Sequence, residues 1–307
     1  EYGIKTGSNE FFLVNDEKVR LWGIEDEYLK LAVTSNRDVK FIQLLPKDIK
    51  CYMLMVHEPK DSLKGKNVLK YLDYGEQMEI TTKRGTRVAA AVVKGVQNLT
   101  SVKHRKLWYD LGKSKVAPIL FPYLMWERSL FVLNQAEAYV TDNLHEIYPH
   151  SKENTLILLG LLNSTLTAML LELYGRSYGG GVLKIQTYEL KELPIPDPRK
   201  ISLNARKKIE NALLIFADAQ RKNDKRSVEE AQKELDNAVF DVLGLTESER
   251  KQVYEGLEAL RQMRFQRKEV EVLVETSEKW MPPKKPERKR KIVEEELAKR
   301  LDSWIKL

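Results

Sequence analysis

The chain has 307 residues, of which 52 are Lys or Arg and 45 are Asp or Glu, so it carries a net charge of +7 at pH 7. This length fits roughly two domains of ~100–200 residues, and a hydrophobic content of 42% excludes a disordered chain. Its single cysteine, Cys51, excludes a disulfide within the chain and a Cys-based zinc site, as expected of a protein in a reducing compartment such as the cytoplasm.

The first 198 residues predict a domain of mixed helices and strands. Short β-favouring runs, separated by Gly, Pro and Asn-Asp turns, lie at 11–14, 18–22, 40–45, 50–56, 115–123 and 129–133. Helices are predicted at 67–78 and at 155–173, and a Gly-rich turn follows at 175–181. The three prolines of 193–198 end regular structure, because each fixes φ and removes a backbone donor.

Residues 154–171 form the longest uncharged run of the chain, close to the ~18–20 residues that a membrane span needs. The run contains Thr155, Asn163 and Ser164, which are unfavourable in lipid but ordinary in a protein interior. We therefore expect a helix buried in protein and no membrane partner.

Residues 199–276 predict a small helical domain, because apolar residues recur there at helical spacing in three successive segments. Thr246 and Glu249 have the spacing of a capping box at the start of the third segment. Residues 277–291 predict a basic, Pro-rich linker, and 292–307 an amphipathic C-terminal helix. The predicted fold class is therefore α+β, with a mixed domain followed by a small helical domain and a C-terminal helix.

Motifs that carry catalytic chemistry are missing from the sequence. It has neither a nucleotide-binding Gly-rich loop nor a Gly-x-Ser-x-Gly nucleophile turn, so no catalytic residue is predicted. The four histidines are scattered without the spacing of a metal site, so no metal is predicted. Glu189-Leu190-Lys191 matches the Glu-x-Lys end of metal-dependent nucleases, and a nuclease that uses Glu189 and Lys191 stays open as an alternative.

Basic residues alternate with aromatic ones in several predicted loops. Residues 103–115 are the densest case, Trp126 and Arg128 lie between two predicted strands, and Arg176 and Tyr178 lie in the Gly-rich turn. Phosphates bind Lys and Arg, whereas bases stack on aromatic rings, so this pattern indicates nucleic-acid contact. In the alternative interpretation, Trp108 and Trp126 belong to the core and the charges form a solvated surface.

Five motifs occur in one order along residues 1–198. They are Gly3-Ile-Lys-Thr-Gly-Ser-Asn-Glu-Phe-Phe12, Leu69-Lys-Tyr-Leu-Asp-Tyr-Gly-Glu76, Arg105-Lys-Leu-Trp-Tyr-Asp-Leu-Gly112, Leu158-Leu-Gly-Leu-Leu-Asn-Ser164, and Gly179-Gly-Gly-Val-Leu-Lys-Ile185 with Leu190-Lys-Glu-Leu-Pro-Ile-Pro196. In this order they resemble the target-recognition region of adenine-specific DNA methyltransferases, the TaqI-like and fused restriction–modification enzymes. The residues around Glu234 to Thr246 also resemble material found after that region.

The catalytic half of that family has no counterpart here. The sequence lacks Asn-Pro-Pro-Tyr or Asp-Pro-Pro-Tyr and the Gly-rich loop for S-adenosylmethionine, and Met281-Pro-Pro-Lys284 is no substitute. The resemblance implies that this chain holds no cofactor, and that S-adenosylmethionine binds in a catalytic domain outside it. Because the sequence opens on Glu1 rather than Met, we expect it to have been cut from a longer chain or processed.

The resemblance also implies partners and site residues. Duplex DNA and a catalytic methyltransferase domain or subunit are the expected partners, and a nuclease is a further candidate. The residues expected to contact phosphate are Lys5, Lys103, Arg105, Lys113, Lys115 and Arg176. Those expected to contact or stack on bases are Asn9, Trp126, Arg128 and Tyr178. Those expected to allow unusual φ or close backbone approach are Gly3, Gly7, Gly179, Gly180 and Gly181.

In this interpretation the chain forms one wall of a DNA cleft and offsets the few kcal/mol needed to take an adenine out of the stack. A second interpretation makes the helical part a scaffold that docks a methylase or nuclease partner. Its discriminating feature is the apolar stripe of the last predicted helix, formed by Val293, Leu297, Leu301 and Trp304.

Overall fold

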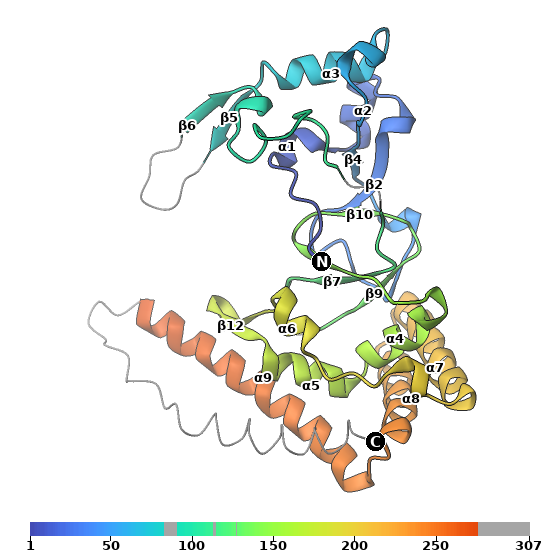
Figure 1. Cartoon of the computed structure of the whole chain (residues 1–307). Helices are drawn as coiled ribbons and strands as arrows, with labels where there is room; N and C mark the ends of the chain where they lie inside the picture. Colours follow the sequence, from blue (N-terminus) through green and yellow to red (C-terminus); the bar gives the residue numbers. More distant parts are fainter. Residues whose placement is uncertain (83–90, 113–114, 127, 276–307) are drawn as a thin grey trace. The chain divides into compact units, whose positions relative to one another are not determined.

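A computed structural model describes residues 1–82, 91–112, 115–126 and 128–275 (Figure 1). Helices and strands are mixed along the chain and helices dominate its C-terminal part, which confirms the predicted α+β class. Lys113, the predicted linker 277–291 and the predicted helix 292–307 lie outside the described residues.

The chain folds as two compact units that are not continuous in sequence. The N-terminal unit contains Glu1–Lys40, Leu44–Pro118 and Asn134–Glu146, and the C-terminal unit contains Phe41–Gln43, Ile119–Leu133 and the chain from Ile147 on. Strands β3 (Gln43–Leu44), β9 (Val132–Asn134) and β11 (Leu144–Ile147) each include a point where the chain passes from one unit to the other.

The N-terminal unit is built on a small mixed sheet in the order β1-β4-β2-β10. Strands β1 (Leu13–Val14) and β2 (Leu29–Val33) both pair antiparallel with β4 (Tyr52–Leu54), whereas β10 (Tyr139–Val140) runs parallel to β2. A separate antiparallel hairpin joins β5 (Glu79–Thr82) to β6 (Ala91–Lys94). The helices of this unit are α1 (Asn9–Phe12), α2 (Asp16–Trp22) and α3 (Asn67–Gly75).

An aromatic core holds the N-terminal unit together. The Phe11 ring stacks on the Tyr71 ring of α3 at 4.8 Å, and the Tyr71 hydroxyl donates to the Phe11 carbonyl at 2.8 Å. The Glu25 carboxylate accepts hydrogen bonds from the first two amides of α3, at 2.6 and 3.0 Å, which satisfies donors that a helix N-terminus leaves open. The helix predicted over 67–78 is confirmed by α3.

Of the predicted strands, one is a helix and one is half helical. Residues 18–22 belong to α2, because the Asn15 side chain accepts from the Lys18 amide at 2.9 Å at its start and Gly23 ends it at φ +63°. Within 11–14, the two phenylalanines end α1 and only Leu13–Val14 is a strand. In 18–22 the local caps outweigh the β-favouring composition.

The C-terminal unit combines short strands with a helical bundle. Strand β7 (Ile119–Pro122) pairs antiparallel with β9, and β8 (Leu124–Met125), β12 (Arg176–Tyr178) and β13 (Val182–Lys184) form a three-stranded sheet. The bundle contains α4 (Thr155–Leu162), α5 (Thr165–Tyr174), the short α6 (Thr187–Lys191), α7 (Leu203–Lys222), α8 (Lys225–Leu243) and α9 (Glu247–Glu275).

The apolar run predicted as one helix is broken into α4 and α5, which meet at 76°. Asn163 follows the last residue of α4, and its side chain bonds the Phe131 backbone, accepting from its amide at 3.1 Å and donating to its carbonyl at 3.0 Å. Ser164 then caps α5 by accepting from the Thr167 amide. Among the described residues, no single helix has the length and hydropathy of a membrane span, and α4 and α5 reach them only when taken together.

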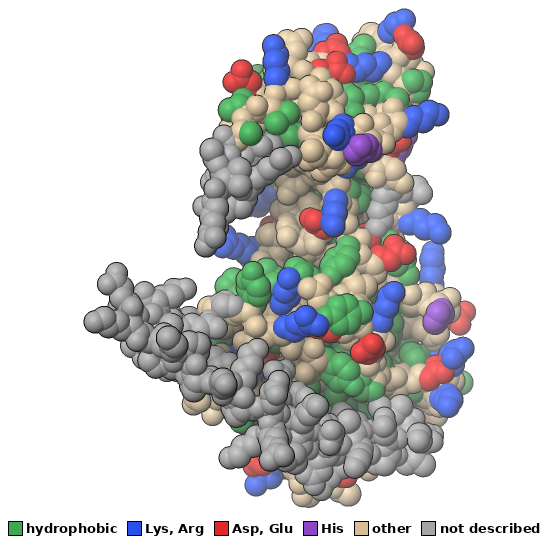
Figure 2. Space-filling view, turned by 60° about the vertical axis from the view of Figure 1, so that its left-hand side comes forward, with side chains coloured by type: hydrophobic (Ala, Val, Ile, Leu, Met, Phe, Trp, Pro, Cys, Tyr) green, Lys and Arg blue, Asp and Glu red, His purple; other side chains and the backbone are tan. Residues whose placement is uncertain are grey.

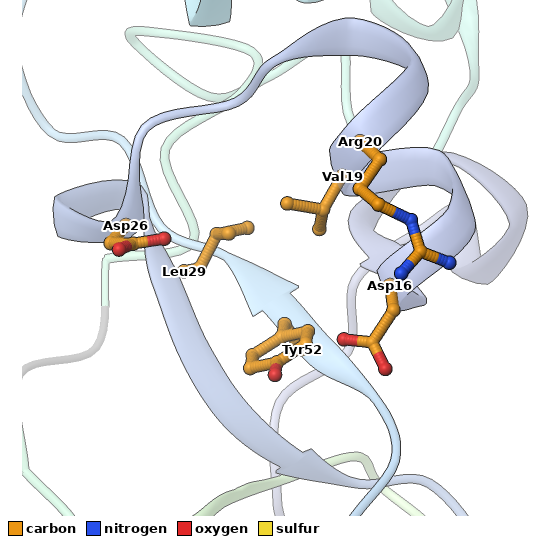
Figure 3. Close-up of a pocket in the computed structure, with 6 residues that line it drawn as sticks. All are labelled: Asp16, Val19, Arg20, Asp26, Leu29 and Tyr52. Carbon is orange, nitrogen blue, oxygen red and sulfur yellow. The ribbon is translucent and has the colours of Figure 1, made fainter.

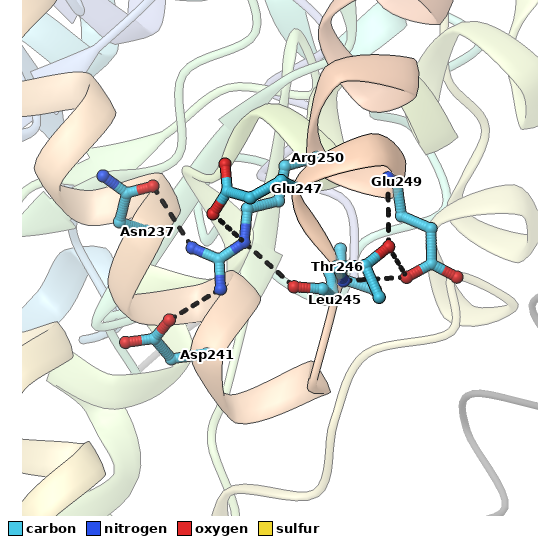
Figure 4. Close-up of polar contacts among 7 residues, drawn as sticks. All are labelled: Asn237, Asp241, Leu245, Thr246, Glu247, Glu249 and Arg250. Carbon is cyan, nitrogen blue, oxygen red and sulfur yellow. Dashed lines mark hydrogen bonds and ion pairs between the residues drawn. The ribbon is translucent and has the colours of Figure 1, made fainter.

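The three helices predicted after residue 200 are confirmed as α7, α8 and α9. The capping box is also confirmed: the Thr246 amide donates to the Glu249 carboxylate at 2.8 Å and the Glu249 amide donates to the Thr246 hydroxyl at 3.4 Å (Figure 4). Arg250, one turn into α9, donates to Asp241 of α8 at 2.7 Å and to the Leu245 carbonyl at 3.0 Å. These contacts join the start of α9 to the end of α8.

The helical residues pack on the helices that precede them rather than forming a compact unit of their own. Gly160 of α4 lies so close to Ile209 of α7 that a Cβ would stand 2.4 Å from the Ile209 side chain. Buried Asp236 of α8 accepts from the Thr165 amide of α5 at 2.7 Å and from the Tyr254 hydroxyl of α9 at 3.0 Å. Residues on both sides of position 198 therefore belong to one compact unit. The domain boundary at residue 198 stays a prediction.

Candidate nucleic-acid interface

The sheet β12–β13–β8 presents cations and aromatic rings on one face. Arg176 lies opposite Lys184, and Lys184 lies opposite Leu124, so these three share a face. Tyr178 joins them because it follows Arg176 by two residues in the same strand. On the other face, Leu183 opposes Met125, and both are buried.

Cation–aromatic contacts extend this face beyond the sheet. The Lys184 ammonium lies 5.0 Å from the centre of the Tyr123 ring and 5.4 Å from that of Tyr178, and the Arg176 guanidinium lies 5.6 Å from that of Tyr188. We call Tyr123, Arg176, Tyr178, Lys184 and Tyr188 the aromatic–basic face. Figure 2 shows Lys and Arg side chains set among hydrophobic ones on the surface of the C-terminal unit.

Arg176 is held in place by Glu189 and Tyr188, yet its side chain remains accessible to solvent. Its Nε donates to Glu189 at 2.7 Å and its Nη2 donates to the Tyr188 hydroxyl, while the arginine side chain stays 65% exposed. The hydrogen bond with Glu189 raises the pKa of Arg176, which keeps the guanidinium charged. The arginine is therefore held in place and can still bind an anion from the solvent side.

Two aromatic residues predicted to contact bases are exposed, Tyr178 at 62% and Trp126 at 51%. Trp126 follows β8 directly and is not part of the core, so the core interpretation of this tryptophan is wrong. Exposed rings beside cations can stack on bases while the cations contact phosphates. The structure thus brings Arg176, Tyr178 and Trp126 to one three-stranded sheet.

Glu189, the candidate nuclease carboxylate, has a structural explanation. It is buried, accepts from Arg176, from the Gln186 amide at 2.7 Å and from the Tyr188 hydroxyl at 3.0 Å, and so caps α6. Within the described parts of the chain, no group of three or more His, Cys, Asp or Glu side chains is placed to hold a metal ion. The geometry therefore gives the nuclease alternative no support.

A second set of predicted residues lies in the N-terminal unit. The Arg105 Nη2 donates to the carbonyls of Lys5 and Thr6 at 2.8 and 2.9 Å, and the guanidinium lies 5.6 Å from the centre of the Phe12 ring. Burial lowers the pKa of Arg105. The structure thus brings Lys5 and Arg105 together, but the arginine serves the fold itself.

Gly3 and Gly7 let the first residues pack closely. A Cβ on Gly3 would stand 2.3 Å from the Thr141 carbonyl oxygen, and one on Gly7, at φ +84°, would stand 2.5 Å from Val102 Cγ2. The neighbouring Asn9 is exposed and accepts from the Thr6 hydroxyl at 2.5 Å. The close approach at both glycines is to this chain's own atoms.

The remaining predicted residues are cations outside the strands of the sheet β12–β13–β8 and the three glycines of its β12–β13 turn. Lys103, Lys115 and Arg128 are exposed, and Gly180 and Gly181 both have φ +76°. Gly179 begins the turn between β12 and β13. Trp108, whose core interpretation the structure confirms, is half-buried and donates from its indole nitrogen to Glu76 at 2.9 Å.

Sequence reasoning missed Lys184, Tyr123 and Tyr188. The signal for Lys184 is its place in the run Val182-Leu183-Lys184, where alternation puts it on the face opposite to Leu183. No local signal marks Tyr123 or Tyr188. Tyr123 joins the face only through its contact with Lys184, and Tyr188 only because α6 places it beside Arg176.

A pocket of about 390 Å³ lies in the N-terminal unit, between α2 and β2–β4 (Figure 3). Its lining mixes two carboxylates and one guanidinium with apolar side chains, from Asp16, Val19, Arg20, Asp26, Leu29 and Tyr52. None of the residues predicted to contact DNA lines it.

Comparisons with known proteins agree with these features. The family of the type II methyltransferase M.Eco57I, C-terminal domain, matches residues 1–240. Type II methyltransferase M.AccI of Acinetobacter calcoaceticus is 26% identical over 202 residues, 62% of this chain and 34% of that protein. Type II methyltransferase M.XamI of Xanthomonas campestris pv. amaranthicola is 28% identical over 109 residues, 34% of this chain and 20% of that protein.

This chain spans about a third or less of the length of these relatives. Among solved structures, the type IIL restriction-modification enzyme MmeI in complex with DNA is similar, with a TM-score of 0.54 and 17% identity over 85% of this chain and 35% of that one. That likeness shows the fold alone. On the family match, which covers more than half of its residues, the chain belongs to the family of the C-terminal domain of type II methyltransferases such as M.Eco57I.

Proposed function

We propose that this chain is the DNA target-recognition portion of an adenine-specific methyltransferase of a restriction–modification system. It positions duplex DNA so that a catalytic domain outside this chain flips and methylates the target adenine. The sequence has no motif for S-adenosylmethionine, so the cofactor belongs to that catalytic domain. A type II methyltransferase relative and the DNA complex of MmeI support a role in handling DNA.

The aromatic–basic face is the observation that carries the proposal. Arg176, Tyr178 and Lys184 share one face of the sheet, Tyr123 and Tyr188 contact these cations from outside it, and Leu183 and Met125 on the opposite face are buried. Arg176 and Lys184 offer positive charge to phosphates, while Tyr178, together with neighbouring Trp126, offers ring surface to bases. Tyr178 and Trp126 are each more than half exposed, so both rings can accept a stacked base.

The first test is a titration of a fluorescent duplex with the full chain at two salt concentrations. Six phosphate contacts predict a loss of about a thousandfold in affinity between roughly 50 and 200 mM salt. Selection from random duplexes then identifies the recognised site. Affinity that is independent of salt, or no binding even when the catalytic domain is supplied as a second chain, would contradict the proposal.

Docking of a partner protein by the helical part is the second candidate function. Helix α7 exposes Leu214 and Ile215, at 43% and 46%, next to each other on its surface. Changing both to Lys would abolish capture of the methylase domain and leave DNA affinity unchanged if this surface docks that domain. Unchanged capture would exclude it.

A further inference from the structure

Arg264 of α9 is a buried arginine that forms hydrogen bonds with two backbone carbonyls in addition to its ion pair with Glu172. Its side chain is 4% exposed and bonds Glu172 of α5 at two points, through Nε and Nη2, both at 2.8 Å. Glu172 is itself 6% exposed. This two-point geometry fixes the plane of the guanidinium.

The other N–H groups of Arg264 reach the sheet that carries the aromatic–basic face. Nη1 donates to the Gly181 carbonyl, and Nη2 donates to the Trp126 carbonyl at 2.6 Å. Gly181 ends the turn between β12 and β13, and Trp126 follows β8. One guanidinium therefore holds two segments, the turn that sets β12 against β13 and the residue that presents an exposed indole.

The helical bundle fixes where Arg264 stands. Gly256 of α9 lies against Met169 of α5, so close that a Cβ would stand 3.1 Å from its sulfur. Arg264 also lies beyond residue 240, where the family match ends, so this support comes from a part of the chain that the family description does not cover.

We infer that Arg264 is a positioning residue for DNA recognition, which transmits the geometry of the helical bundle to the aromatic–basic face and Trp126. The inference rests on the proposed function, since it gives that face a fixed framework. A lysine cannot replace it, because an ammonium is a point charge that cannot bond a carboxylate at two points and reach two carbonyls as well.

The test compares Arg264→Lys with Arg250→Lys in the full chain. Both change an arginine of α9, but only Arg264 contacts the sheet. For Arg264→Lys we expect DNA affinity to fall on the order of tenfold. This is the lower end of the loss of affinity in metal sites when a residue that orients a ligand is removed. Amide exchange at residues 124–126 and 176–184 should become faster in the free protein. Arg250→Lys should leave both unchanged.

A double variant, Arg264→Met with Glu172→Leu, covers the case in which the single variant does not fold. It removes Arg264 and Glu172 together, so that Glu172 is not left as a buried carboxylate without Arg264, and removal of a whole buried pair is often neutral for stability. Arg261 also loses its 3.8 Å ion pair with Glu172, but its side chain is 28% exposed. The same loss of DNA affinity and the same faster exchange are expected, because the two carbonyls still lose their donor.

The outcomes separate the two claims. Salt-dependent DNA binding by the unsubstituted chain, with affinity and exchange unchanged in the Arg264 variants, would overturn the positioning role and leave the proposed function intact. If the unsubstituted chain shows no salt-dependent DNA binding even with the catalytic domain supplied as a second chain, the proposed function fails and the positioning role fails with it, whatever the exchange pattern.

Discussion

In the N-terminal unit Arg105 lies over Phe12 and gives its hydrogen bonds to the carbonyls of Lys5 and Thr6, whereas in the C-terminal unit Arg176 lies over Tyr188 and pairs with Glu189 at the surface. The local chemistry is the same: an arginine, an aromatic ring and nearby glycines. What differs is the source of the arginine's partners. Backbone carbonyls of a folded-back segment hold the first guanidinium, which is half-buried, while a single buried carboxylate anchors the second and leaves it 65% exposed.

Gly3 of the N-terminal unit is packed against backbone atoms, whereas the Cβ position of Gly180 in the C-terminal unit is open. This contrast predicts the largest effect on stability. Gly3→Ala should lower the free energy of unfolding by about 3 kcal/mol, because the new Cβ meets backbone oxygens that cannot move aside. Gly180→Ala should cost only about 1 kcal/mol, the strain of a positive φ, since no atom lies within 4 Å of its Cβ position. Urea unfolding measures both, and equal losses would contradict the distinction.

Arg105→Met tests whether the first arginine serves the fold. The methionine keeps apolar contact with Phe12 but leaves the carbonyls of Lys5 and Thr6 without their donor, so we expect a loss of about 2 kcal/mol in stability. Lys103→Met, at an exposed neighbour, should change stability by less than about 0.5 kcal/mol. If Arg105→Met instead leaves the urea midpoint unchanged and weakens DNA binding, Arg105 contacts phosphate as the sequence predicted.

Tyr178→Ala tests the aromatic–basic face. Loss of one stacking ring should cost about 2 kcal/mol of binding free energy, or roughly thirtyfold in Kd, with the urea midpoint unchanged. Tyr178→Phe should retain the affinity, because the ring face remains. Tyr74→Ala, at an exposed tyrosine of α3, is the matched control, and an equal loss there would mean that ring exposure alone does not identify the interface.

Charge substitutions give the smallest effect and sharpen the comparison further. Arg176→Gln should lower the slope of log affinity against log salt by about 0.9, the contribution of one phosphate contact. The same change at Lys5 or Lys103 measures whether the N-terminal unit also contacts phosphate. An altered slope only at Arg176 would confine the phosphate contacts tested to the C-terminal unit.

Helical periodicity and caps made much of the fold predictable. Apolar spacing located α3 and α7–α9, and the pair Thr246 and Glu249 identified the start of α9. The prediction of one long helix over 155–173 was wrong because a polar side chain reached outside its own segment. Asn163 breaks the apolar helix because it bonds the Phe131 backbone, a partner that no local pattern reveals.

The candidate site was predictable in composition but not in arrangement. Arg176, Tyr178 and Trp126 could be selected because bases and phosphates need such side chains. Their meeting on one sheet depends on the pairing of β8 with β13, which is a long-range choice of the fold. Lys184 was missed for the same reason, since its position opposite Arg176 exists only once the strands pair.

The interleaving of the two units has a consequence for synthesis. The parallel pairing of β10 with β2, and the bridge between Ile4 and Thr141, close the N-terminal unit with residues that the ribosome makes more than a hundred positions after the first ones. By then residues 119–133, which belong to the other unit, have already emerged. Long-range pairing of this kind is slow, so the β2 edge of the nascent sheet stays unpaired until β10 has been made. Chaperone dependence during expression would therefore end only when residue 146 has left the ribosome.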